Sequence, residues 1–151
     1  MKSLKNIFNN KDQLLPQIIG YCGLLPLLVA IILNFYNLTT IDVIELAIVY
    51  SYTILAFLGG IYWGVGLKLE IKFNKFYLIS ILPTILILIN LIISGTKFFN
   101  LIFILASLNL FLLLEIFFLK NYNLFRWFFL LRIKLNILFT CLIIILVISI
   151  K

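Results

Sequence analysis

The stretch YSYTILAFLGGIYWGVGL, residues 50–67, holds four glycines and one tryptophan within an otherwise apolar run. Glycine destabilises a helix by roughly 0.5–1 kcal/mol relative to alanine and leaves the backbone bare. In a bilayer, glycine can favour helix association, because helices without large side chains can approach one another closely. At about 1.5 Å per residue, the run also covers most of a hydrocarbon core. It predicts a membrane-spanning helix.

The composition of the whole chain extends this prediction beyond one segment. Of its 151 residues, 65% are hydrophobic and 11% are charged, whereas soluble domains are about 45–50% apolar and about 25% charged. A chain of this length cannot hide so much apolar surface inside one core, so lipid must be the solvent for most of it. We expect a single all-α integral membrane domain over residues 1–151.

Apolar runs of about 20 residues, the length that crosses a hydrocarbon core, define the expected spans. The fifth run is short, which leaves open a start within FFLLRIKL, residues 128–135. The segment 123–135 reads either as an amphipathic stretch along the membrane surface or as a simple loop into the fifth helix. The five predicted spans are residues 17–36, 46–67, 76–94, 98–119 and 135–150.

Basic residues alternate between the segments that join these spans. Ten of the twelve lie in the N-terminal segment and in the second and fourth connections, and only Lys97 and Lys151 lie elsewhere. The positive-inside rule makes the basic segments cytoplasmic, so we expect the N-terminus in and the C-terminus out. The richness in Ile, Asn, Lys and Phe is typical of an AT-rich genome and favours the bacterial cytoplasmic (inner) membrane.

The glycine-rich face of the second span has two interpretations. Ala56, Gly60 and Gly64 repeat every four residues, the spacing that lets two helix backbones pack closely in lipid. Alternatively, Trp63 stands over Gly59 and Gly60, and a bare floor beside an aromatic wall would form a slot for a flat or lipidic ligand. The sequence alone leaves both interpretations open.

Glu115 is an acidic residue placed well within an apolar run, where ionisable groups are costly and often functional. We expect an ion pair between Glu115 and Arg132, with Lys134 as the other candidate partner. Placement of the carboxylate at the lipid headgroups and a role in proton relay or substrate binding are the alternatives.

The chain offers little of the chemistry that enzymes use. It has no histidine, which removes the commonest general base and metal ligand. The glycine-rich run also lacks the Gly-Lys-Ser/Thr ending of a phosphate loop. The net charge of +7 comes from basic residues between apolar runs, where they set topology. We therefore expect no enzymatic activity, no cofactor, no metal and no nucleic-acid partner.

Three segments together resemble one family of polytopic membrane proteins: GYCGLLPLL (20–28), the opening stretch, and WFFLLRIKL (127–135). In order and spacing they are similar to an uncharacterised family that includes transmembrane protein 69 and is known as domain of unknown function 3429. The family's Gly-x-x-Gly-x-x-Pro pattern and the start of its Phe-Leu-Gly core fall on these positions: Gly20, Gly23, Pro26, Phe57 and Leu58.

The resemblance also bears on three further positions. The family core places a histidine where this chain has Tyr62, which argues against a shared metal or acid–base histidine here. A later Leu-Arg pair corresponds to Leu131 and Arg132. The resemblance implies a membrane-embedded helical fold over nearly the whole chain, and it carries no established activity.

Two classes of function are compatible with these observations. The first is a non-catalytic accessory or assembly protein that binds membrane lipids, another membrane protein or a second copy of itself. The second is a small oligomeric transporter or lipophilic-ligand-binding protein that uses the slot at Gly59 and Trp63. A stoichiometric protein partner would favour the first, and a small molecule bound beside Trp63 would favour the second.

Overall fold

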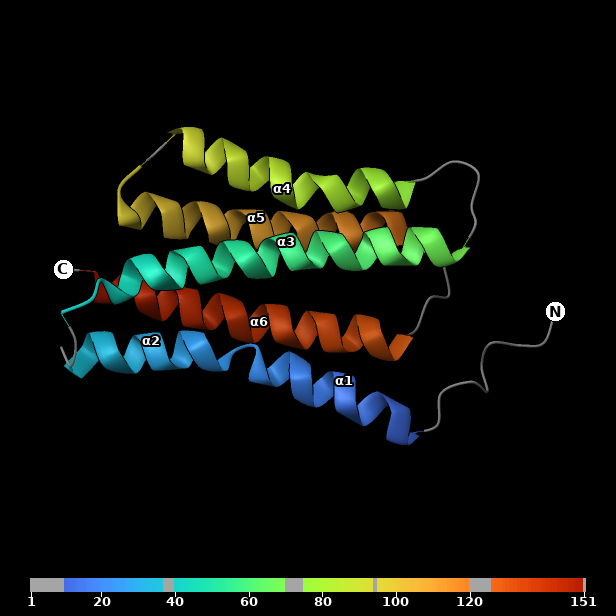
Figure 1. The fold of residues 1–151 in the computed structure, drawn as a ribbon, viewed down its shortest axis with the longest axis horizontal. Helices are drawn as coiled ribbons and strands as arrows, with labels where there is room; N and C mark the ends of the chain where they lie inside the picture. The colour runs from blue at the N-terminus through green and yellow to red at the C-terminus, as the bar shows by residue number, and fades with distance from the viewer. Residues whose placement is uncertain (1–9, 37–39, 70–74, 94, 120–125, 151) are drawn as a thin grey trace.

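The computed structural model describes residues 10–36, 40–69, 75–93, 95–119 and 126–150, and every regular element in these ranges is an α-helix (Figure 1). Five spans are long and apolar enough to cross a membrane, which confirms the predicted all-α bundle. The spans are Leu14–Tyr36, Val43–Leu67, Phe76–Ile93, Lys97–Phe117 and Trp127–Ser149. The helices are α1 (Asn10–Cys22), α2 (Leu25–Tyr36), α3 (Val43–Leu69), α4 (Lys75–Ile93), α5 (Lys97–Leu119) and α6 (Arg126–Ser149).

The fifth span begins earlier than the predicted residue 135. From Arg126 onward, the segment interpreted as a surface stretch or a loop is the first part of α6, whereas residues 123–125 lie outside the described residues. The basic residues near Arg132 lower the local hydropathy, which made the apolar run look shorter. The structure accommodates Arg132 within the helix because its guanidinium is paired with an acidic residue of α5.

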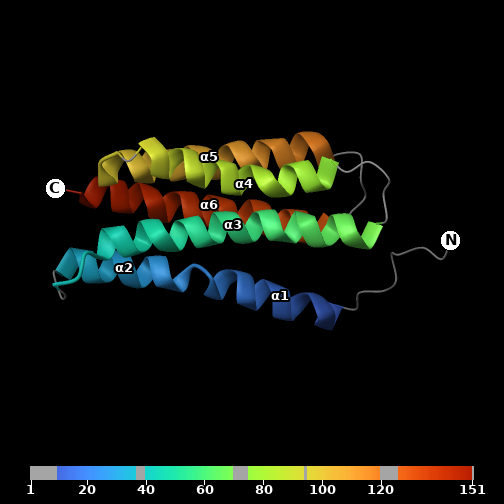
Figure 2. The same ribbon diagram turned by 45° about the horizontal axis from the view of Figure 1, so that its top comes forward.

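The five spans run side by side with alternating direction and form one bundle, in which α1 and α2 follow one another along the first span (Figures 1 and 2). Helix α3 contacts α2, α4 and α5, and α6 contacts α1, α2 and α5. The start of α1 and the end of α6 lie at opposite ends of the bundle, as an odd number of crossings requires.

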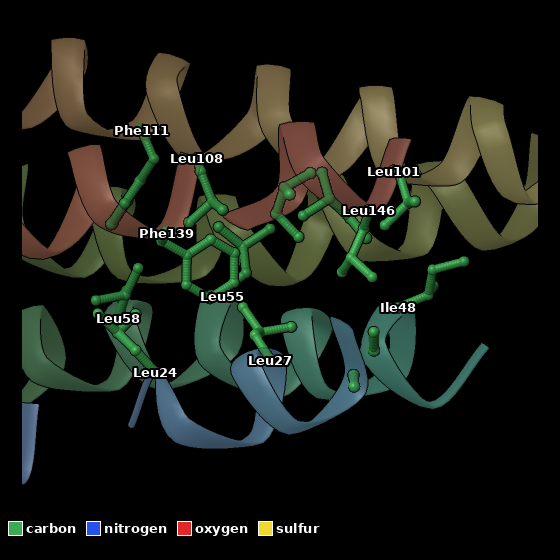
Figure 3. Packing of buried hydrophobic residues seen from close by; sticks show 14 of the residues in the cluster. Leu24, Leu27, Ile48, Leu55, Leu58, Leu101, Leu108, Phe111, Phe139 and Leu146 are labelled. Atoms are coloured by element: carbon green, nitrogen blue, oxygen red, sulfur yellow. The ribbon is translucent and has the colours of Figure 1, made fainter. Parts of the chain in front are cut away.

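The core lies where α2, α3, α5 and α6 meet (Figure 3). Leu27, Phe111, Ile143 and Leu146 are 0% exposed and bring these helices together. Many other large apolar side chains are exposed on the outside of the bundle, as Phe117 is at 77%. An apolar outer surface of this kind suits lipid as the surrounding solvent.

The first span is broken between α1 and α2. Pro26 lies in the first turn of α2, where its missing amide hydrogen is tolerated but its ring cannot continue the preceding helix. The amide of Leu24 turns back to the carbonyl of Tyr21 at 3.0 Å. The hydroxyl of Tyr50 on α3 donates to the carbonyl of Gly23 at 2.6 Å. A neighbouring helix therefore satisfies a backbone group at the break, as a lipid environment demands.

Asp42 fixes the start of α3. Its Oδ1 accepts a hydrogen bond from the amide of Glu45 at 3.2 Å, which is the geometry of a helix N-cap. Its carboxylate also pairs with the ammonium group of Lys97, and this hydrogen bond is the main reason that the pKa of Asp42 lies below its ordinary value of 3.8. The lowered pKa means that the stabilisation is present above pH 3.8 and is lost as the pH falls through the lowered value. Both side chains are exposed, so the contribution is small.

Candidate functional site

Gly59 brings α3 and α4 into direct backbone contact. A Cβ atom at this position would overlap the carbonyl oxygen of Ser80 and touch the ring of Pro83, both on α4. Trp63 contacts Tyr77 of α4 in a tilted ring pair, with 4.9 Å between the ring centroids. Helix α4 therefore covers Gly59, one of the two glycines that the sequence suggested as the floor of a ligand slot.

Three other small residues of α3 point away from this contact. Ala56, Gly60 and Gly64 are exposed. Among the described residues, no heavy atom lies within 4 Å of a Cβ built at Gly60 or Gly64, apart from the helix's own backbone and chain neighbours. The structure thus separates the glycines of this helix: Gly59 and Gly66 pack against α4, whereas Gly60 and Gly64 face outward.

Glu115 and Arg132 lie together inside the bundle. The Nε of Arg132 is 3.3 Å from Oε2 of Glu115 and 3.4 Å from its Oε1. Glu115 is 0% exposed, so its carboxylate is enclosed by the bundle, and Lys134 is exposed. The buried Tyr62 of α3 lies close to the same carboxylate. The acidic group thus pairs α5 with α6, beside α3.

A second polar cluster continues from this pair along α6. The Nδ2 of Asn136 donates to Oδ1 of Asn109 on α5 at 3.1 Å. The Nδ2 of Asn109 donates to the carbonyl of Leu105 at 2.8 Å and to the hydroxyl of Thr140 at 3.3 Å. Arg132, Asn136 and Thr140 are spaced four residues apart, so they form one polar stripe on α6. In a bilayer such interhelical hydrogen bonds are worth roughly 1 kcal/mol each or less.

A cavity of about 490 Å³ lies between α1, α3 and α6 and reaches α5 at its inner wall. Arg132 and Asn136 are the charged and polar side chains among the residues that line it. Leu15 and Phe57, which are also among these residues, are 64% and 66% exposed, so the cavity borders the outer surface of the bundle. The lining residues are Leu15, Pro16, Ile19, Gly20, Gly23, Leu24, Ile54, Phe57, Leu58, Ile61, Leu108, Phe128, Leu131, Arg132, Leu135, Asn136 and Phe139.

Comparison with known proteins places the chain in one family. The family described as Protein of unknown function (DUF3429) matches residues 14–148, which is nearly the whole chain. The chain belongs to this family. No curated protein and no solved structure matches it.

The DUF3429 motif residues named from the sequence converge on the cavity. Gly20 and Gly23 reach it from α1 and the break that follows, and Phe57 and Leu58 reach it from α3, whereas Pro26 is not among the lining residues. A Cβ atom at Gly20 would lie 2.8 Å from Cδ1 of Leu135, so this glycine lets α1 approach α6 closely. Residues far apart in the sequence therefore build one shared space.

Asn136 is a site residue that the sequence analysis missed. It lies at the start of the predicted fifth span, where polar residues are common, and Arg132 was placed in the connection before it. A helix beginning at Arg126 puts both on one face. The spacing of Arg132, Asn136 and Thr140 was the signal that a longer predicted helix would have exposed.

Proposed function

We propose that this chain is a non-catalytic accessory protein of the bacterial cytoplasmic membrane that binds a lipophilic molecule in the cavity between α1, α3 and α6. The observation that carries the proposal is the cavity itself, whose volume of about 490 Å³ falls in the range of roughly 300–1,000 Å³ typical of small-molecule sites. Its lining is apolar apart from Arg132 and Asn136. That pattern of apolar walls with few polar groups is the usual one for a binding site.

The surroundings of the cavity favour entry from the bilayer. It lies within the membrane-spanning parts of α1, α3 and α6, and its rim includes the exposed side chains of Leu15 and Phe57. A molecule dissolved in the hydrocarbon core can reach this rim without crossing a polar layer. The polar side chains of the lining are the guanidinium of Arg132, which is paired with Glu115, and the carboxamide of Asn136. These two groups can orient a ligand by hydrogen bonding.

The orientation in the membrane is part of the proposal. The excess of basic residues in alternate segments supports a cytoplasmic N-terminus and an external C-terminus. With this orientation the start of α1 lies toward the cytoplasmic leaflet. A C-terminal alkaline phosphatase fusion is expected to be active, and an active N-terminal fusion would contradict the orientation.

Filling the cavity is expected to remove the bound molecule. The double variant Ile54→Phe/Ile61→Phe adds two large rings to the α3 wall of the cavity. We expect gently extracted wild-type protein to carry a lipophilic molecule in native mass spectra, and the double variant to lose most of that signal. The control is Ile81→Phe/Leu88→Phe, which makes the same kind of change at the same spacing on exposed positions of α4.

The comparison between the two variants decides the outcome. Loss in the cavity variant with retention in the α4 control supports the proposed function. Equal retention in both, or wild-type protein that carries nothing from native membranes, would overturn it. Circular dichroism and thermal unfolding in detergent check that both variants keep the helical bundle.

A further inference from the structure

Two buried polar atoms of residues that line the cavity lack a hydrogen-bond partner among the described residues. They are Nη2 of Arg132 and Oδ1 of Asn136. Arg132 is 6% exposed and Asn136 is 2% exposed, and both side chains line the cavity. An unpaired buried polar group costs roughly 1–3 kcal/mol. Both atoms lie just beneath the cavity surface, so a bound molecule that shifts these two side chains would satisfy one donor and one acceptor.

The hydrogen bonds of the neighbouring cluster fix which atom of Asn136 is left over. The carbonyl of Leu105 can only accept a hydrogen bond, so the group of Asn109 that faces it is the Nδ2 donor. The Oδ1 of Asn109 therefore faces Asn136. Since this oxygen accepts a hydrogen bond, the group of Asn136 that contacts it must be the Nδ2 donor. The remaining atom of Asn136 is an oxygen, so its missing partner is a donor.

The charges beside the cavity favour a neutral ligand. The guanidinium of Arg132 is compensated by the carboxylate of Glu115 at 3.3 Å. An added anion would approach this carboxylate as well as the guanidinium, and it has no hydrogen to give to Asn136. A hydroxyl group meets both requirements, because it accepts one hydrogen bond and donates another.

We propose that the cavity binds a neutral lipid with a free hydroxyl group, which accepts a hydrogen bond from Nη2 of Arg132 and donates one to Oδ1 of Asn136. The hydrocarbon part of the molecule lies along the apolar lining toward the rim at Phe57. This inference rests on the proposed function, since it names the class of molecule that occupies the same cavity.

A set of probes with one shared chain tests the polar contact. Delipidated wild-type protein is held in an amine-oxide detergent, whose headgroup has no hydroxyl, and binding of dodecan-1-ol, 1-methoxydodecane, dodecane and dodecanoate is compared by native mass spectrometry. We expect dodecan-1-ol to bind about tenfold more tightly than the methyl ether, because the ether leaves Asn136 without its donor. Dodecane and dodecanoate are expected to bind more weakly than the alcohol.

The probe outcomes separate this inference from the proposed function. Equal binding of alcohol, ether and alkane would overturn the hydroxyl contact and leave the cavity as a purely apolar site whose polar atoms bind water. Tighter binding of dodecanoate would also overturn it and assign the site to an anion. If the double variant Ile54→Phe/Ile61→Phe binds every probe as tightly as the wild type does, the cavity is not the binding site.

A matched pair of substitutions tests the role of Asn136 directly. Asn136→Leu removes the oxygen from the cavity, whereas Asn90→Leu makes the same change at a buried asparagine of α4 that bonds Tyr52 and does not line the cavity. The preference for alcohol over ether is expected to disappear in Asn136→Leu and to persist in Asn90→Leu. Persistence in both would contradict the proposal. If Asn136→Leu does not fold, the wild-type probe series still decides the question.

Discussion

Replacing Glu115 with glutamine is expected to lower the free energy of unfolding by about 3–5 kcal/mol, the usual cost of removing one partner of a buried ion pair. The carboxylate is 0% exposed and pairs with Arg132, which is 6% exposed, so the substitution leaves a buried guanidinium without its counter-charge. Chemical unfolding in mixed micelles, followed by circular dichroism, measures the loss.

The double variant Glu115→Gln/Arg132→Met provides the control for this prediction. It removes both charges together, and such replacements of buried pairs are often close to neutral. We expect it to recover most of the stability that Glu115→Gln loses. Additive losses in the double variant would mean that the two side chains are not energetically coupled, in conflict with the 3.3 Å contact.

Replacing Gly59 with alanine is expected to destabilise the bundle by about 1–3 kcal/mol, the range seen for overpacked interiors. The new Cβ would overlap the carbonyl oxygen of Ser80, which belongs to backbone and cannot swing away. Helices α3 and α4 would have to separate. The same unfolding experiment in mixed micelles measures the effect.

Gly60→Ala is the adjacent control. A Cβ at Gly60 meets no heavy atom within 4 Å among the described residues outside its own helix backbone and chain neighbours. Alanine also stabilises a helix by roughly 0.5–1 kcal/mol relative to glycine. We expect the Gly60 variant to be at least as stable as the wild type. Equal losses at both positions would show that α4 does not pack against Gly59.

The bundle could be predicted from sequence because its signals are local and repeated. Apolar runs of membrane length define the spans, and these agree with the structure except at the start of the fifth. That start was left open between residues 128 and 135, because the charges near Arg132 resemble a connection until a partner for them is known. The partner, Glu115, lies on another helix, and hydropathy along one segment carries no information about it.

The candidate site was harder to predict because it depends on which faces meet. The spacing of Gly59, Gly60 and Gly64 indicated close packing in general, yet only the position of α4 shows that Gly59 is the residue in contact. The cavity likewise depends on the break between α1 and α2 at Gly23 and Leu24. This break lies beside α3 and α6, which come from distant parts of the chain. No single motif contains that arrangement.

A crystal structure of the protein grown from a lipidic mesophase tests the central claim most directly. We predict elongated density in the cavity between α1, α3 and α6, ending in a polar group within hydrogen-bonding distance of Arg132 and Asn136. Helix α1 closed against α3 and α6, with the side chains of Ile61 and Leu135 filling the space, would contradict the account.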